Sequence, residues 1–438
     1  MMGNDMGTGI GGIIRTVVNP GRETWEALTS RPVFDVSELF GTARRVLDDV
    51  RREGDTAVRR YGLEFDSVDL PSVEVSEAEK EEAFSAVPEV LRSAIGTALR
   101  NIEKFHSAQR ILPPEVETFP GVRCWQRRTP VEKVGLYVPG GTAPLLSTVL
   151  MLAVPARVAG CREVVLCSPP GPDGRLHPAV TFAATLSGVE RIFKVGGIQA
   201  IGAMAYGTET IPRVYKIFGP GNRYVTAAKQ LVGIDSVAID MPAGPSEVEI
   251  IADDAADPVF VAADILSQAE HGIDSQAILV STSRNVIDLT LREVARQLPL
   301  LERRLTARGA LSNSLAVVFD NYDDVVSFTD FYAPEHLIIQ TRNYGELSDR
   351  VSNAGSVFLG PYTPESAGDY ASGTNHTLPT NGHARAYSGL SLESFTKRIT
   401  FQEITREGIN GLGPTILAMA EGERLSAHGR AVSVRMGR

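Results

Sequence analysis

The stretch Val134-Gly-Leu-Tyr-Val138, followed at once by Pro139-Gly-Gly141, opens the part of the chain that decides the fold. A short apolar run that ends in a Gly-rich turn is typical of a buried strand leading into a helix. Further apolar runs of this kind lie at residues 164–167, 192–195, 214–218 and 237–239. Most of the segments between these runs are long enough for one helix each. This alternation predicts a parallel β-sheet built from βαβ units.

The same alternation is repeated further along the chain. Its apolar runs lie at residues 248–251, 277–280, 315–319, 336–339 and 356–359. The Pro- and Gly-rich stretch Asp240-Met-Pro-Ala-Gly-Pro245 separates the two series and predicts a junction. No segment at the predicted strand ends reads GxGxxG, the usual dinucleotide fingerprint. We therefore predict two Rossmann-like parallel-sheet domains in which this fingerprint is incomplete.

The flanking regions have different patterns. Residues 1–12 are rich in Gly and Met and predict a flexible extension. The region before residue 133 predicts helices, with capping boxes at Asp35–Glu38 and Ser76–Glu79 and a helix after Pro88. Residues 383–438 predict a helical tail with little apolar content, which must pack on something else, such as a second subunit.

Composition excludes several classes of protein. The 438 residues include 43 Lys plus Arg and 53 Asp plus Glu, a net charge of −10 without a basic run, which argues against nucleic acid as a partner. The longest apolar run, Val149–Val154, is far too short to span a bilayer, and no secretory signal is visible. Three cysteines without metal-binding spacing predict a reducing compartment, the cytoplasm.

Three polar clusters stand out from the apolar pattern. They are Ser267–Gly272, Ala333–His336 and Glu365–His376. The last places Asp369 and His376 seven residues apart in a Gly- and Ser-rich stretch without apolar periodicity, which we interpret as a loop. Polar loops between regular elements are frequent sites of binding and catalysis.

The first and third clusters, with His428, offer metal-ligating side chains. Gln268 and His271 are three residues apart at the end of a predicted helix over 259–270, so their side chains share one face. Together with Asp369 and His376 they form a nitrogen and oxygen set that suits Zn²⁺ or a similar ion. The alternative is that these histidines cap a helix and satisfy loop hydrogen bonds.

The second cluster offers acid–base chemistry. Glu335 and His336 open a predicted strand, where neighbouring side chains normally point to opposite faces. The backbone at a strand entrance is irregular, so both could still reach one pocket. An imidazole suits proton abstraction, and a carboxylate beside a metal suits activation of water. A solvent-exposed polar dipeptide is the alternative.

Gly-rich turns follow three predicted strands of the first series, at residues 139–141, 196–197 and 219–222. Backbone N–H groups at the start of the next helix can bind anionic groups there. The pattern favours an anion or nucleotide site at the carboxyl ends of the strands, and ordinary turn chemistry is the alternative for each glycine.

Several longer motifs closely resemble the histidinol dehydrogenase family, in order and with few changes of spacing from about residue 13 to the C-terminus. They lie at residues 135–141, 195–200, 219–222, 244–248, 267–272, 334–336, 368–376 and 423–428. The resemblance implies an enzyme of histidine biosynthesis with one Zn²⁺ per subunit. It would oxidise L-histidinol through L-histidinal to L-histidine with two NAD.

The resemblance also implies roles by position. The implied zinc ligands are Gln268, His271, Asp369 and His428, which with His336 also contact the substrate. Further implied substrate contacts are Ser246, His376 and Glu423, and the implied acid–base pair is Glu335 and His336. The implied NAD contacts are Tyr137, Gln199 and Asn222. In the family, residues matching His428 and Glu423 reach the site of the other subunit of a homodimer.

On this resemblance, residues 133–240 form the smaller, NAD-binding domain. Residues 13–132 and 241–382 form a larger domain with the metal and catalytic residues, and residues 383–438 form the tail that contacts the partner subunit. Three alternatives stay open at this point: a relative that oxidises another alcohol, such as a sulfonated diol, a zinc hydrolase, and a non-catalytic nucleotide-binding protein. The last leaves the Gln, His, Asp and His set unexplained.

Overall fold

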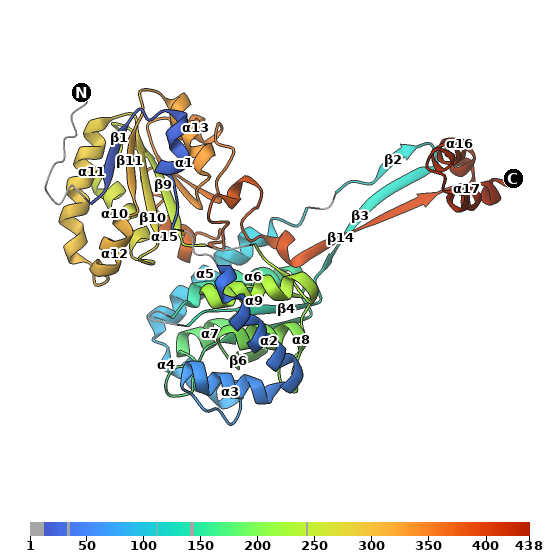
Figure 1. The fold of residues 1–438 in the computed structure, drawn as a ribbon, viewed down its shortest axis with the longest axis horizontal. Coiled ribbons are helices and arrows are strands. Elements are labelled where there is room, and N and C mark those ends of the chain that lie inside the picture. The colour runs from blue at the N-terminus through green and yellow to red at the C-terminus, as the bar shows by residue number, and fades with distance from the viewer. Residues whose placement is uncertain (1–12, 33–35, 112, 141–143, 242–243) are drawn as a thin grey trace.

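The computed structural model describes residues 13–32, 36–111, 113–140, 144–241 and 244–438. These residues form two α/β lobes and a long arm that carries the C-terminus at its tip (Figure 1). The predicted extension at residues 1–12, Asp35 of one predicted capping box, Gly141 and part of the predicted junction lie outside the described residues. The other predicted capping box is confirmed at Ser76 and Glu79.

One lobe is built on a five-stranded sheet in which all neighbouring strands are parallel. Its strands, in spatial order, are β6 (Arg191–Lys194), β5 (Glu163–Ser168), β4 (Lys133–Tyr137), β7 (Lys216–Phe218) and β8 (Ala238–Ile239). Numbered along the chain this order is 3-2-1-4-5, as in one half of a doubly wound nucleotide-binding sheet. The first predicted series of strands is thereby confirmed.

Helices cover both faces of this sheet. One face carries α5 (Glu89–Ser107), α6 (Leu146–Ala159) and α7 (Pro178–Leu186), with α4 (Glu77–Ala86) beside α7. The other carries α2 (Phe40–Glu53), α3 (Asp55–Asp66), α8 (Gly197–Tyr206) and α9 (Arg223–Asp235). Helices α2 to α5 thus pack on the five-stranded lobe, whereas residues 13–132 were predicted to belong to the larger, metal-bearing domain. Their apolar stripes, including Leu47 of α2 and Leu99 of α5, face this sheet's core.

The other lobe is built on a six-stranded, fully parallel sheet. Its order is β1 (Arg15–Val18), β11 (Leu315–Val318), β10 (Gln276–Ser281), β9 (Glu247–Ala252), β12 (His336–Gln340) and β13 (Ser356–Leu359). The last five again follow the order 3-2-1-4-5 and confirm the second predicted series. Edge strand β1 was not predicted, because Arg15 and Thr16 leave it only two consecutive apolar residues.

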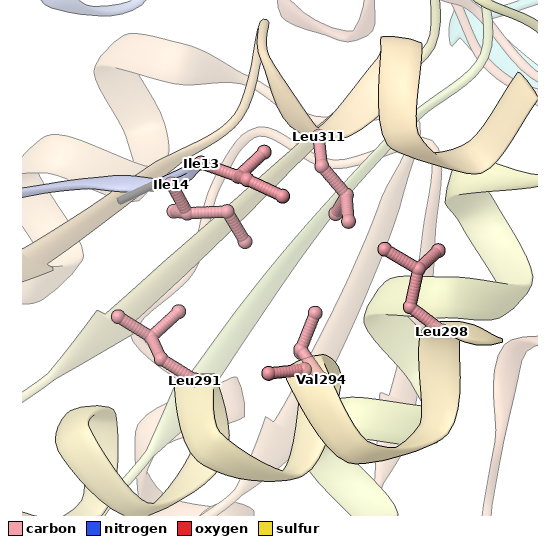
Figure 2. A pocket seen from close by; sticks show the side chains of 7 residues that line it. Ile13, Ile14, Leu291, Val294, Leu298 and Leu311 are labelled. Atoms are coloured by element: carbon pink, nitrogen blue, oxygen red, sulfur yellow. The ribbon is translucent and has the colours of Figure 1, made fainter. Parts of the chain in front are cut away.

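Two helical layers enclose this sheet as well. One layer contains α10 (Pro258–Ala269), α11 (Arg284–Gln297) and α12 (Arg304–Leu311). The other contains α1 (Trp25–Leu28), α13 (Tyr322–Tyr332) and α14 (Tyr344–Ser348). A small apolar void has a volume of about 10 Å³. Figure 2 shows side chains that line it, among them Ile13, Leu291 and Val294. A space of that size without polar groups is a packing gap rather than a ligand site.

The arm joins distant parts of the chain. Its sheet is antiparallel, and it ends in two helices at the tip (Figure 1). Its elements are β2 (Val116–Phe119), β3 (Val122–Pro130), β14 (Thr396–Ile404), α16 (Arg406–Gly422) and α17 (Ser426–Ser433). The predicted tail has its helices at α16 and α17, but it also contains strand β14, which pairs with β3 along nine residues of each strand. None of the helices in the described ranges is long and apolar enough to cross a membrane.

A buried ion pair fixes the turn that follows β7. The Lys229 ammonium donates to an Asp240 carboxylate oxygen and to the Gly219 carbonyl oxygen, the latter at 2.8 Å. The second Asp240 oxygen accepts from the Gly219 N–H at 2.7 Å. Gly219 has φ +123°, and a Cβ there would lie 2.0 Å from the Tyr137 carbonyl oxygen. The turn therefore requires glycine, and the ion pair satisfies both of that glycine's backbone groups.

We predict that Lys229→Met lowers the free energy of unfolding by about 3–5 kcal/mol, because it leaves the Asp240 carboxylate buried without its counter-charge. The double variant K229M/D240N removes that charge and retains an acceptor for the Gly219 N–H. It should regain most of the loss in urea denaturation. A double variant as unstable as K229M would contradict this assignment.

Candidate active site

The predicted pair Glu335 and His336 lies at the amino edge of the six-stranded sheet. Both side chains contact the backbone of Glu247, the first residue of β9: the Glu247 N–H donates to Glu335 Oε2 at 2.9 Å, and His336 Nδ1 lies 3.2 Å from the Glu247 carbonyl oxygen. A carbonyl only accepts, so Nδ1 carries the hydrogen and Nε2 holds the lone pair. The irregular strand entrance brings the two side chains within 3.6 Å of each other.

The polar stretch after β13 is partly helical rather than a loop throughout. Helix α15 (Glu365–Tyr370) places Glu365 and Asp369 on one face, four residues apart. Asp369 Oδ1 lies 3.7 Å from His336 Nε2, and Glu365 Oε1 lies 3.8 Å from His336 Nδ1. Both acids are buried. Asp369 and His336, predicted as site residues, are thus brought together, and Glu365 joins them.

Helix α10 supplies the predicted Gln268 and His271. A His271 ring nitrogen and one carboxylate oxygen each from Glu365 and Asp369 lie within 4.8 Å of one another. Gln268 is fully buried, and both its amide nitrogen and its amide oxygen lack a hydrogen-bond partner among the described residues. Buried amide groups are seldom left unpaired, so the Gln268 oxygen is free to bind a ligand.

The segment after α15 ties this group to the other lobe. His376 Nδ1 lies 3.1 Å from the Asp369 carbonyl oxygen, and His376 Nε2 lies 3.3 Å from the Thr148 hydroxyl of α6. The neighbouring Asn375 amide donates to the Met151 carbonyl oxygen at 2.7 Å. Ser246 directly precedes β9 at the same sheet edge. The group therefore lies where the six-stranded lobe meets α6 of the five-stranded lobe.

Burial changes the pKa of nearly every ionisable group here. It raises the pKa of Glu335 and Glu365 well above the ordinary value and that of Asp369 to about 7. Burial lowers the pKa of His336 to about 3 and that of His376 to about 4. Desolvation opposes charge in every case. A cluster of acids and imidazoles held away from water is typical of a functional site.

The Glu247 side chain is held by a second buried ion pair. Arg31 binds both Glu247 carboxylate oxygens, donates to the Tyr332 carbonyl oxygen at 2.6 Å, and stacks 4.0 Å from the centre of the Tyr332 ring. Because the backbone of Glu247 contacts both Glu335 and His336, Arg31 helps to fix their positions from outside the site.

A cavity with a volume of about 1100 Å³ lies at the carboxyl edge of the five-stranded sheet. Tyr137, Ser168 and Asn222, from the ends of β4, β5 and the turn after β7, line it. This is where open parallel sheets bind ligands. Pro144 also lines the cavity, and Thr148, four residues later on α6, contacts His376. The cavity and the polar group therefore border the same end of α6.

Two of the three predicted NAD contacts, Tyr137 and Asn222, line this cavity. The third, Gln199, does not line it but contacts a residue that does. The Tyr137 hydroxyl accepts from the Gly197 N–H at 3.1 Å, and burial raises the pKa of Tyr137 to about 12. Gln199 is fully buried, and its amide donates to the cavity-lining Asp66 at 3.5 Å. Asn222 caps α9 through its side-chain oxygen.

His428 and Glu423 are not brought to the site within one chain. His428 lies in α17 and Glu423 at the end of α16, and both are exposed at the tip of the arm (Figure 1). The arm carries them away from α10 and α15.

Comparison with known proteins gives the family. The family model described as histidinol dehydrogenase matches residues 29–436. The chain belongs to the histidinol dehydrogenase family. A histidinol dehydrogenase of Bacteroides thetaiotaomicron is 58% identical over 424 residues, which cover 97% of this chain and 99% of that protein. One from Aliivibrio fischeri is 51% identical over 414 residues, covering 94% and 93%.

A solved structure agrees with the family and the fold. The crystal structure of histidinol dehydrogenase from Elizabethkingia anophelis superposes with a TM-score of 0.96 at 51% sequence identity. The match covers 97% of this chain and 98% of that chain. The two-lobed architecture with its arm is therefore that of a histidinol dehydrogenase.

Sequence reasoning missed two residues of this histidinol dehydrogenase site. Glu365 lies in the predicted polar stretch but was not among the predicted site residues, although its separation of four residues from Asp369 is a helical spacing. Glu247 contacts Glu335 and His336 through its backbone N–H and carbonyl oxygen, and the residue type does not reveal such backbone contacts. A search for helical spacing in the polar stretch would have found the first residue but not the second.

Glu249, two residues after Glu247 on β9, gives a test of how burial affects stability. It is fully buried, lies 2.5 Å from the Thr329 hydroxyl, and has its pKa raised to about 8 by desolvation. Between its unfolded value near 4.5 and about 8, the folded chain holds a proton that the unfolded chain releases. This group's contribution to stability is therefore full below the unfolded pKa and is lost as the pH rises to about 8.

The free energy of unfolding of the parent should fall as the pH rises from 5 to 8, in part because of Glu249. We predict that Glu249→Gln makes this slope shallower by at most about 1.4 kcal/mol per pH unit, the limit for one proton. Urea midpoints across this pH range, in the presence of a chelator, measure the slope for parent and variant. Parallel slopes would show that Glu249 is not protonated in the folded chain.

Proposed function

We propose that this chain oxidises L-histidinol through L-histidinal to L-histidine with two NAD, in the cytoplasm, as the last steps of histidine biosynthesis. The observation that carries the proposal is the convergence of His271, His336 and Asp369 in a member of the histidinol dehydrogenase family. A large cavity at the edge of a nucleotide-binding type of sheet borders the same helix.

The donors present fit a zinc ion. Gln268 offers a buried oxygen without a partner, and His271 and Asp369 offer a ring nitrogen and a carboxylate oxygen. Amide, imidazole and carboxylate groups suit Zn²⁺. We propose that these three residues, with His428 of a second copy, hold one zinc per subunit. A bound zinc would orient an amino alcohol and stabilise its developing alkoxide.

His336 has the geometry of a general base. Its Nδ1–H is directed to the Glu247 carbonyl oxygen, which leaves Nε2 as a proton acceptor on the side of Asp369. Nε2 has no hydrogen-bond partner among the described residues, and burial keeps the ring neutral. We propose that Nε2 takes the hydroxyl proton of histidinol in the first oxidation and that of the hydrated aldehyde in the second.

Glu335 is placed to act on water in the second oxidation. One of its oxygens is fixed by the Glu247 N–H, and its carboxyl group lies beside His336. We propose that Glu335 takes a proton from the water that adds to histidinal. Ser246 and His376, with Glu423 of a second copy, would hold the substrate's polar groups. NAD would bind the cavity near Tyr137, Gln199 and Asn222.

We predict that His336→Asn lowers the rate of both oxidations by about 10²–10⁴-fold, whereas Glu335→Gln chiefly slows the oxidation of histidinal. NADH absorbance measures both, with histidinol or histidinal as substrate. The parent should form two NADH per histidinol, and a chelator should abolish the reaction. Histidinal oxidation at the parent rate by Glu335→Gln would contradict the role of Glu335.

The arm suggests a homodimer with shared sites. His428 and Glu423 lie at its tip, away from the site of their own chain, and the tip also exposes the apolar side chains of Met419, Leu425 and Val434. We propose that each arm reaches the site of the other copy.

Mixing two inactive variants tests this arrangement. We predict that His336→Asn and His428→Ala homodimers, unfolded and refolded together, regain about a quarter of the parent activity, because half of the dimers are mixed and each has one intact site. Each variant refolded alone is the control. No activity in the mixture would exclude sharing between subunits.

A further inference from the structure

Glu247 holds both proposed catalytic side chains, and it does so through its backbone and its side chain together. Its N–H and its carbonyl oxygen contact Glu335 and His336, as described above. The backbone N–H groups of Glu335 and Gly382 in turn hydrogen-bond to the Glu247 carboxylate. Glu247 and Glu335 therefore hold each other reciprocally, because the backbone of each contacts the side chain of the other. A shift of Glu247 would displace both catalytic groups.

Arg31 compensates for the burial of the Glu247 carboxylate. The Glu247 side chain is 2% exposed and that of Arg31 is 12% exposed. Burial raises the pKa of Glu247, and the hydrogen bonds and charge of Arg31 oppose this rise. The guanidinium binds both carboxylate oxygens, and such a paired contact fixes the angle between the two groups as well as their distance. Arg31 therefore sets the orientation of the Glu247 side chain in addition to balancing its charge.

Arg31 also holds the turn that leads into the catalytic pair. It donates to the carbonyl oxygen of Tyr332, the last residue of α13. The next residue, Ala333, has φ +53°, in the left-handed region that residues other than glycine seldom adopt. The chain then continues through Pro334 to Glu335. Because a turn of this kind is unfavourable by itself, its surroundings must hold it, and Arg31 does so at the carbonyl group that precedes it.

The contacts of Arg31 form a closed network. The Tyr332 hydroxyl donates to Gln276 Oε1 at 2.9 Å, and the Gln276 amide donates to the carbonyl oxygen of Ser30, the neighbour of Arg31, at 3.2 Å. The N-terminal segment, α13 and β10 thus hold one another around the Glu247 side chain. A closed network of satisfied polar groups has little freedom to shift.

We propose that Arg31 is a positioning residue for both oxidations. It holds Glu247 and the turn at Tyr332–Ala333, and the positions of His336 and Glu335 depend on these two features. This inference rests on the roles proposed above for His336 and Glu335. Loss of Arg31 then slows both steps together, because one backbone supports both catalytic side chains.

Steady-state kinetics of the zinc-loaded, full-length protein test the inference. We expect Arg31→Met to lower kcat by about 10- to 100-fold with histidinol and with histidinal alike, since a displacement of about 1 Å can have an effect of that size. The KM for NAD should stay within about threefold of the parent value, because the cavity lies on the other lobe. Arg31→Lys keeps the charge but not the planar paired contact, so its kcat should lie between those of the parent and Arg31→Met.

Arg191→Met is the matched control. Arg191 also binds both carboxylate oxygens of a glutamate, Glu74, donates to the Thr210 carbonyl oxygen, and stacks on the Phe193 ring. It lies at the start of β6, at the amino edge of the five-stranded sheet. Loss of this ion pair should lower stability in urea and leave kcat unchanged for both steps. A loss of kcat in Arg191→Met as large as in Arg31→Met would overturn the inference.

A double variant separates positioning from stability. Arg31→Met leaves the Glu247 carboxylate buried without its counter-charge, which disfavours the folded state. The double variant R31M/E247Q removes that charge, so it should regain stability in urea and bind zinc as the parent does. We expect it to show the same loss of kcat as Arg31→Met. A folded double variant with the kcat of the parent would mean that Arg31 serves stability alone.

The His336 ring gives a readout that does not depend on the reaction. Proton NMR of protein with isotope-labelled histidine should show an Nδ1–H signal protected from exchange, assigned to His336 by its absence in His336→Asn. We expect this signal to be lost in R31M/E247Q and kept in Arg191→Met. Its retention in R31M/E247Q would contradict the positioning role. A parent that forms no NADH from histidinol, but whose signal depends on Arg31, would refute the proposed function and support the role of Arg31.

Discussion

The structure depends on one electrostatic constraint: Glu335, Glu365 and Asp369 are buried near the amino edge of β9 and β12, and none of the three forms an ion pair with a Lys or Arg of the described chain. Asp369, Glu335 and Glu365 lie away from water, and Gln268 has no partner for its amide. Each such group disfavours the folded state unless something binds it. A sequence that retains them all is organised around a ligand rather than around stability alone.

The rest of the fold holds this group in place. Parallel pairing of β9 with β12 sets His336 beside Val248 and so brings the Glu247 backbone to both His336 and Glu335. Arg31 neutralises Glu247 from the opposite side. Contacts of the 375–376 segment with α6 join the group to the lobe with the large cavity. A site between lobes allows each lobe to supply a different part of the chemistry.

Much of this fold could be predicted from sequence. All ten strands of the two apolar series form where their periodicity placed them, since buried parallel strands have continuous apolar runs bounded by turn residues. Strands β2, β3 and β14 were missed because the arm is largely solvent-exposed and has no buried face to create a pattern. An apolar stripe does not specify which sheet a helix packs against, so the packing of α2 and α5 on the five-stranded lobe could not be predicted from it.

The site was predicted in part. Residue types and motif resemblance selected Gln268, His271, Glu335, His336 and Asp369, and of these the structure places His271, His336, Asp369 and Glu335 in one group. Glu365 was missed because α15 was interpreted as a loop, and Glu247 because it acts through its backbone. His428 lies at the tip of the arm, away from the site of its own chain, and no sequence pattern could specify that position.

The most direct measurement is an anomalous-diffraction map of zinc-loaded crystals of the full chain. The account predicts one strong peak per subunit, within bonding distance of Gln268 Oε1, a His271 ring nitrogen and an Asp369 oxygen. A peak elsewhere, with Gln268 still unpaired and the acids of α15 bound to protein groups instead, would contradict it.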